Sequence, residues 1–186
     1  SCGCTPRAAR RRSGSTGRRR CEVRIIVGID PGLANTGIVA LDERERVVLA
    51  TTIRSAGEGQ PEFSGVMERG MAVASGVVEA LQPLENVERV AIEGYEDFGP
   101  HLRGARNRWT TPAVAALIGS KVASAGYTVE WQSPSAVMRA YSAHKRMWEQ
   151  KRAVIEGDDA LTNDHLRSAA AHALWASGLR DVVTLL

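Results

Sequence analysis

The sequence lacks the features that mark membrane proteins and secreted proteins. Its 186 residues contain no stretch near the roughly 18 uninterrupted apolar residues that a membrane-spanning helix needs. The N-terminus also lacks the apolar segment of a secretory signal. The sequence therefore predicts a soluble protein with no membrane partner. Its length suits one domain with a proper core and is too short for two large lobes.

Cysteine is absent from residues 22–186, because Cys2, Cys4 and Cys21 all lie in or beside the N-terminal segment. A zinc site needs four ligands in spaced pairs, and neither a fourth cysteine nor a nearby histidine accompanies these three. We therefore predict no zinc site here. A domain without cysteine suits a reducing cytosol.

Acidic residues are absent from residues 1–20, which hold seven of the 24 basic residues, all arginines. The remainder carries 17 basic against 21 acidic side chains, so the net charge of +3 comes from this segment. Because it shows no hydrophobic periodicity, we predict a disordered Arg-rich tail over residues 1–21 and one domain over 22–186. The tail fits a DNA-contacting arm, an organelle-targeting sequence or upstream sequence without a role, and we favour the last.

Short β-branched runs and amphipathic segments alternate through the domain. They predict strands over 23–29, 36–42 and 47–53, a helix over 62–81, a strand over 87–93, a helix over 111–124, a strand over 127–131, a helix after 133 and a last helix over 164–177. Thr111-Pro112 and Ser133-Pro134 are helix-start signals, and Gly126 predicts a helix end.

This order of elements predicts the sheet. Three strands joined by short links form an antiparallel meander, and a helical crossover places each later strand parallel to its neighbour. The predicted fold is therefore an α/β, RNase H-like mixed five-stranded sheet, with three antiparallel strands, two parallel strands and helices on both faces.

Two acidic residues end neighbouring strands of this predicted sheet. Asp30 follows the first strand and Glu93 ends the fourth. Ligand sites in α/β sheets gather beyond the carboxyl ends of the strands, so the two carboxylates are expected to converge. Adjacent buried carboxylates repel each other, and a hard cation such as Mg²⁺ removes that repulsion. Either acid alone is better explained as a solvated strand end, but the pair favours a metal site.

Four segments resemble RuvC-type Holliday junction resolvases, a family of RNase H-like nucleases. They are Val27-Gly28-Ile29-Asp30-Pro31-Gly32 with Thr36-Gly37, Val90-Ala91-Ile92-Glu93, Ser133-Pro134-Ser135-Ala136-Val137, and Leu161-Thr162-Asn163-Asp164-His165-Leu166-Arg167-Ser168-Ala169 continuing to Ala173-Leu174. The resemblance spans nearly the whole domain. It implies that the last of these segments is the metal-ligand helix.

The last segment departs from the family pattern, which is His or Asp, two residues, then Asp. Here His165 is followed by Ser168, and residues three apart share one face of a helix. Serine is neutral and a weaker Mg²⁺ ligand than a carboxylate. Asp164 fits a compensating ligand and a helix N-cap equally well. His172, further along, is better explained as an ordinary packed or surface histidine than as a site residue.

Two basic clusters are predicted to contact the DNA backbone, and the first is favoured because it follows Glu93. Arginines beside an aromatic ring suit phosphate contact and base stacking. The predicted DNA-binding residues are Arg103, Arg106, Arg108, Trp109, Lys145 and Arg146.

The resemblance implies a Mg²⁺-dependent endonuclease that cuts four-way or other branched DNA with two ions, with Mn²⁺ as a substitute. The implied catalytic residues are Asp30, Glu93, Asp164, His165 and Ser168, and all but Ser168 are implied metal ligands. It further implies a homodimer without a nucleotide cofactor, acting in the cytoplasm at the nucleoid or as a phage protein in its host. Two alternatives stay open, namely a catalytically weakened branched-DNA-binding relative and a YqgF-type rRNA-processing nuclease. An ATP-binding actin-like domain is disfavoured because it needs two lobes.

Overall fold

Five strands form one mixed sheet at the centre of the structure, a computed structural model that describes residues 23–55, 63–95, 109–143 and 163–179. The strands are β1 (Ile25–Asp30), β2 (Asn35–Leu41), β3 (Val47–Arg54), β4 (Val87–Glu93) and β5 (Val129–Gln132). They lie in the order β3-β2-β1-β4-β5. The pairs β1–β2 and β2–β3 are antiparallel, whereas β1–β4 and β4–β5 are parallel. The predicted sheet is confirmed, and the predicted tail at 1–21 lies outside the described ranges.

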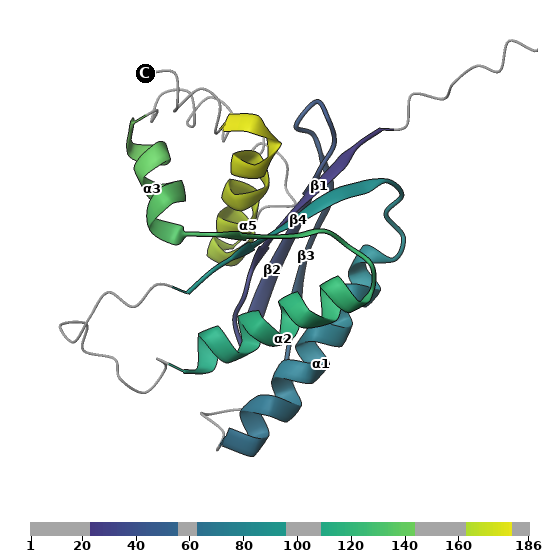
Figure 1. Ribbon diagram of the computed structural model, residues 1–186, viewed down its shortest axis with the longest axis vertical. Coiled ribbons are helices and arrows are strands. Elements are labelled where there is room, and N and C mark those ends of the chain that lie inside the picture. Colours follow the sequence, from purple (N-terminus) through teal and green to yellow (C-terminus); the bar gives the residue numbers. More distant parts are fainter. Residues whose placement is uncertain (1–22, 56–62, 96–108, 144–162, 180–186) are drawn as a thin grey trace, which may run out of the picture.

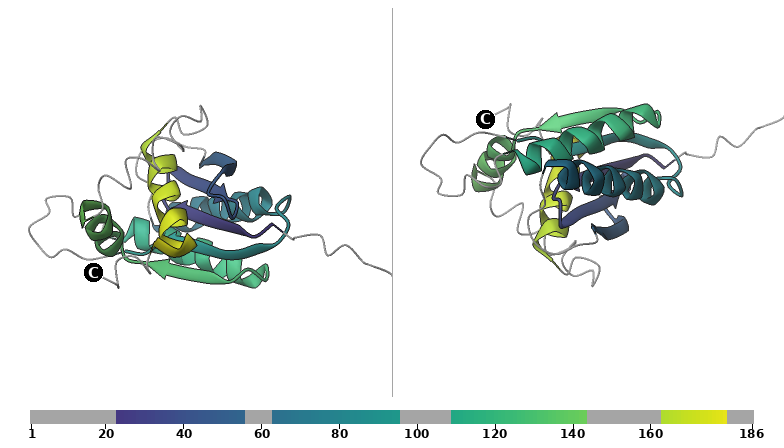
Figure 2. Two further views of the ribbon diagram at one scale, coloured as in Figure 1. Left: turned by 90° about the horizontal axis from the view of Figure 1, so that it is seen from above. Right: turned by 90° about the horizontal axis from the view of Figure 1, so that it is seen from below.

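Helices cover both faces of the sheet, as predicted. They are α1 (Phe63–Leu81), α2 (Thr110–Ser124), α3 (Pro134–Ala143) and α5 (Asp164–Leu174), and α5 runs into the π-helical turn η2 (Trp175–Leu179). Figure 1 shows α1 and α2 side by side on one face, with α5 on the other. The two views in Figure 2, from above and from below, show the same layers from opposite sides.

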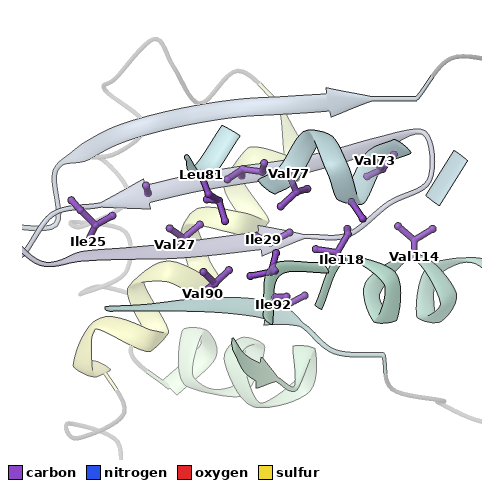
Figure 3. Close-up of a cluster of buried hydrophobic side chains, with 14 residues drawn as sticks. Ile25, Val27, Ile29, Val73, Val77, Leu81, Val90, Ile92, Val114 and Ile118 are labelled. Atoms are coloured by element: carbon purple, nitrogen blue, oxygen red, sulfur yellow. The ribbon is translucent and has the colours of Figure 1, made fainter. Parts of the chain in front are cut away.

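The larger apolar core lies between the sheet and the helices α1 and α2 (Figure 3). Side chains alternate between the two faces along a strand, so every second residue of β1 points into this layer. These residues are Ile25, Val27 and Ile29, and β4 adds Val90 and Ile92. The helices contribute Val73, Val77, Leu81, Val114 and Ile118. All of these side chains are buried, so hydrophobic burial fixes α1 and α2 on this face.

Helix α5 packs very closely on the opposite face of the sheet. A Cβ atom added at Gly28 of β1 would lie 1.9 Å from the backbone oxygen of Ala169, and one added at Gly37 of β2 would lie 2.3 Å from that of His165. The helix meets these glycines with small residues, among them Ala169 and Ala173, both fully buried. Glycine on the strands and alanine on the helix thus bring the backbone of α5 directly against β1 and β2.

Several element ends differ from the sequence-based prediction. The residue that caps α2 is Trp109, which makes no side-chain capping hydrogen bond, and not Thr111, so Pro112 stands inside the first turn. The last helix ends at Leu174 and continues as η2, in which Gly178 has a φ of 122°. The signals at Ser133-Pro134 and Gly126 are confirmed: Ala136 N donates to Ser133 Oγ at 3.1 Å, and Gly126, with a φ of 93°, follows α2.

None of the helices in the described ranges has both the length and the apolar character to cross a membrane.

Candidate active site

Two carboxyl groups meet where β1 and β4 end. Ile29 pairs with Ile92 in the parallel ladder, so the next residues, Asp30 and Glu93, stand side by side. Because they alternate with these core isoleucines, both acids point to the face that α5 covers. The convergence expected from the sequence is therefore present.

One stripe of α5 lies over this pair. His165, Ser168 and His172 are spaced by three and four residues, which puts them on one side of the helix. His165 Nδ1 lies 2.8 Å from Asp30 Oδ2. Ser168 Oγ donates to Glu93 Oε2 at 3.0 Å, and His172 Nε2 lies 3.2 Å from the same oxygen. Each carboxyl group thus has a histidine partner from the helix.

A chain of polar side chains extends from His172 away from the carboxyl pair. The Gln132 amide nitrogen donates to Glu130 Oε1 at 3.1 Å, which turns the Gln132 oxygen toward His172. That oxygen lies 2.8 Å from His172 Nδ1, and an amide oxygen only accepts, so Nδ1 is the donor. Arg89 in turn pairs with Glu130 at 3.4 Å. Gln132 and His172 are both buried, so this chain holds the imidazole in one orientation.

The two carboxyl groups differ in acidity although they are neighbours. Burial, together with the negative charge of Glu93, raises the pKa of Asp30 to about 6, although the hydrogen bond and charge of His165 oppose the shift. Burial also raises the pKa of Glu93, but hydrogen bonds from His172, Ser168 and Asp30 outweigh it and leave this pKa below its ordinary value. Below about pH 6 the pair therefore holds a proton, mainly on Asp30, which is the expected response of two adjacent half-buried acids.

No model of a known protein family matches this chain, and no curated protein sequence matches it either. Solved structures do. RuvC of Thermus thermophilus in complex with Holliday junction substrate superposes with a TM-score of 0.65 at 21% identity, over 85% of this chain and 96% of that one. The chain has the RuvC fold. A second Thermus thermophilus RuvC structure gives a TM-score of 0.61 at 19% identity, over 85% of this chain and 96% of that one.

The RuvC fold extends to a eukaryotic neighbour as well. The yeast mitochondrial Holliday junction resolvase Ydc2 gives a TM-score of 0.56 at 10% identity, over 86% of this chain and 83% of that one. Identities this low describe the fold. The resemblance that the four sequence segments indicated is confirmed at that level.

The side chains of this RuvC-fold site include possible ligands for a divalent ion. Within the described ranges, no three His, Cys, Asp or Glu side chains are arranged as a ready-made metal-holding group. The site does contain two adjacent carboxyl groups, and the raised pKa of Asp30 reflects its burial first and then the negative charge of Glu93, which a divalent cation would offset. His165, with a side chain 42% exposed, borders the same position. The donor set therefore suits a cation held mainly by Asp30 and Glu93.

Asp164 lies apart from this cluster. The side chain that caps α5 is that of Asn163, which accepts a hydrogen bond from Leu166 N at 3.0 Å, so the cap expected at Asp164 is one residue earlier. The Asp164 side chain is 94% exposed and pairs with Arg167. It therefore faces solvent, and its role as a ligand stays a prediction that this geometry does not support.

Of the predicted DNA-contacting residues, Trp109 lies in the described ranges. Arg103, Arg106, Arg108, Lys145 and Arg146 lie outside the described residues. Trp109 is described and directly precedes α2, with 39% of its surface exposed. Its role in DNA binding stays a prediction.

Sequence reasoning underrated two residues that contact the carboxyl pair or support it. His172 is packed, as expected, but it also reaches Glu93. The sequence feature that could have indicated this contact is the position of His172, four residues after Ser168 and therefore on the same side of α5. Gln132 was missed because the fifth strand was predicted to end at Trp131, one residue too early.

Proposed function

We propose that this protein is a divalent-metal-dependent endonuclease for branched DNA. The observation that carries the proposal is the half-buried Asp30–Glu93 pair at the carboxyl ends of two adjacent parallel strands, with His165 bonded to Asp30. A lone acid at a strand end is common, whereas two half-buried acids side by side raise the free energy of the folded protein. Neighbouring acids with perturbed pKa values are typical of functional sites.

The roles of the side chains follow from their positions. Asp30 and Glu93 would hold the divalent ion, with His165 as the third group at its edge. Once bound there, the ion would supply positive charge to the scissile phosphate and to the attacking water. His165 is fixed through Nδ1 by Asp30, and its exposed ring leaves Nε2 to position water. Ser168 and His172 of α5 orient the Glu93 carboxylate through their contacts with Oε2.

The DNA substrate is proposed from the fold. A RuvC-fold neighbour is described in complex with Holliday junction substrate, and another is described as a Holliday junction resolvase. We propose four-way or other branched DNA as the substrate of this chain. Cutting two symmetric strands of a junction needs two active sites, so we also propose a homodimer.

The test is cleavage of a synthetic four-way junction and of a linear duplex with the same arm sequence, each with Mg²⁺, with Mn²⁺ and with EDTA. We expect junction-selective cutting that EDTA abolishes. Asp30→Asn and Glu93→Gln should each abolish cutting while junction binding survives, since they remove ligands and keep the side-chain shape. Asp164→Asn should still cut, because that carboxylate faces solvent.

Glu79→Gln is the matched control, because Glu79 is an exposed carboxylate on α1 at the other face of the sheet. It should cut as the wild type does. A wild type that binds junctions tightly but cuts neither substrate would replace the proposal with the binding-only alternative. Cutting of structured RNA in preference to junction DNA would favour the rRNA-processing alternative.

A further inference from the structure

One residue from each strand stands in a row across the face of the sheet that α5 covers. Thr52 of β3 pairs with Gly37 of β2, and Gly37 pairs with Asp30 of β1. Asp30 stands beside Glu93 of β4, which pairs with Gln132 of β5. Figure 2 shows α5, in yellow, crossing the strands rather than running along them. The helix therefore meets this row one strand after another.

The start of α5 is tied to the β3 end of this row. The side-chain nitrogen of Asn163 donates to Thr52 Oγ1 at 3.1 Å. The side-chain oxygen of Asn163 accepts from Leu166 N at 3.0 Å and so caps the helix. Because the cap uses the oxygen of the amide, its nitrogen is the atom that faces the sheet. One side chain therefore both begins α5 and joins it to β3.

His165 follows this tie by two residues and lies over the next position of the row. A Cβ added at Gly37 would lie 2.3 Å from His165 O, so the helix backbone touches the sheet there. Glycine has no side chain, so this contact limits how closely the helix approaches but does not hold it along the strand. The bond from Asn163 to Thr52 has a direction and supplies that hold.

The neighbours of His165 in the first turn of α5 do not supply a comparable bond to the sheet. The Asp164 side chain is 94% exposed and pairs with Arg167 of the same helix. Leu166 packs in the apolar cluster between α5 and β2, and apolar packing is not directional. Among the described residues of this turn, Asn163 is therefore the one that fixes the position of the His165 backbone by a hydrogen bond to a strand.

We propose that Asn163 and Thr52 are a positioning pair, which holds the first turn of α5 so that the His165 ring lies against Asp30. This inference rests on the proposed function where it gives His165 a part in cleavage, whereas the place of the ring can be measured without a substrate. The pair acts through the helix and not on the DNA. Its loss should slow strand cutting rather than weaken binding, because a group misplaced by about 1 Å can cost about 100-fold in rate.

Four variants of the full chain separate the tie from the helix cap. Thr52→Val removes the hydroxyl, keeps a β-branched side chain on β3 and leaves the cap of α5 unchanged. Asn163→Ser keeps a good capping residue whose side chain is too short to reach Thr52. Thr52→Ser keeps the hydroxyl and should restore the tie. Thr51→Val is the matched control, because it makes the same change at the next residue, whose side chain points to the other face of β3.

The place of the ring is measured by the nuclear Overhauser effect between His165 and Gly32, without DNA and at one pH. A Cβ at Gly32 would lie 3.8 Å from His165 Cε1, so a Gly32 α-proton is near the ring. The wild type, Thr52→Ser and Thr51→Val should show the effect, whereas Thr52→Val and Asn163→Ser should lose it with unchanged helix content by circular dichroism. An effect that persists in those two variants, or is absent from the wild type, would overturn the inference.

Junction cleavage by the same proteins separates this inference from the proposed function. In single-turnover reactions, Thr52→Val and Asn163→Ser should cut about tenfold more slowly with unchanged junction affinity, and Thr52→Ser should cut at the wild-type rate. If the effect is lost in the first two variants but even the wild type cuts no junction, the nuclease proposal fails and the positioning pair stands. If the effect is lost and the cutting rate is unchanged, His165 has no part in cleavage and the functional side of the inference fails.

Discussion

On the face toward α1 and α2 the strands carry isoleucine and valine, whereas on the face toward α5 the strands β1 and β4 carry Gly28 and the two acids beside the apolar Val39 and Leu41 of β2. Ile29 and Ile92 are fully buried among aliphatic side chains of the helices. Their immediate neighbours in sequence, Asp30 and Glu93, point the other way and contact polar side chains of α5. The two faces are therefore one residue apart in sequence and opposite in chemistry.

The difference shows how the fold separates stability from the site. The apolar face buries large side chains, and this burial is the main favourable contribution to folding. The α5 face brings backbone against backbone through Gly28 and Gly37, which sets the height of His165 and Ser168 above the carboxyl pair. It also holds two half-buried acids side by side, which destabilises the protein without an ion. Substitutions on the two faces should therefore have different signatures.

Removing a large side chain from the apolar face should have the largest effect on stability. Ile118→Ala leaves a cavity at a fully buried site of α2, so the free energy of unfolding should fall by about 2–5 kcal/mol. Urea denaturation measures this. Ion binding should persist in the folded fraction, because Ile118 does not contact the site. Loss of ion binding in fully folded protein would show that the faces are not independent.

Removing charge from the polar face should stabilise the ion-free protein. The pKa of Asp30 is raised from 3.8 to about 6, so the folded state holds its proton more tightly than the unfolded state does. Stability is therefore lost as pH rises from about 4 to about 6, and the loss is complete above that range. At pH 8 in EDTA, Asp30→Asn should gain up to about 3 kcal/mol, since each pKa unit is worth about 1.4 kcal/mol.

Urea denaturation of both proteins from pH 4 to pH 8 checks this prediction. The stability difference should grow with pH in EDTA and shrink when Mg²⁺ is added, because only the wild type has an ion to bind. Parallel curves for the two proteins would show that Asp30 carries no excess repulsion, which would weaken the case for a metal site.

Adding a side chain at a glycine under α5 should weaken ion binding strongly while lowering stability only modestly. A Cβ at Gly28 would lie 1.9 Å from Ala169 O and 2.5 Å from Ala173 N, so Gly28→Ala must lift the helix. We expect a loss of about 1–3 kcal/mol, as for overpacked cores, and much weaker Mn²⁺ binding by calorimetry.

Gly76→Ala is the matched control on the apolar face, because a Cβ there would meet only the side chain of Ile53, at 3.1 Å. It should bind Mn²⁺ as the wild type does. If Gly28→Ala binds Mn²⁺ as tightly as this control, the glycines do not set the geometry of the site.

The sequence predicted most reliably those features that a local pattern of residues determines directly. Alternation of apolar residues and turn signals predicted all five strands, and the three- and four-residue steps of α1 predicted its extent to Leu81. The meeting of Asp30 and Glu93 was also predictable, because parallel strands end at the same edge of a sheet. Ends of elements were harder, as Trp109 and Asn163 show, because caps differ by small energies.

The alternation of apolar and polar residues along β1 and β4 already determined that Asp30 and Glu93 would share an edge and a face, since a strand has no other way to place successive side chains. The partners of these acids were decided only when α5 packed across the sheet. Contacts such as Ser168 to Glu93 and His172 to Gln132 join residues 75 and 40 positions apart. They depend on how closely two glycines let a helix approach, and no local pattern encodes that distance.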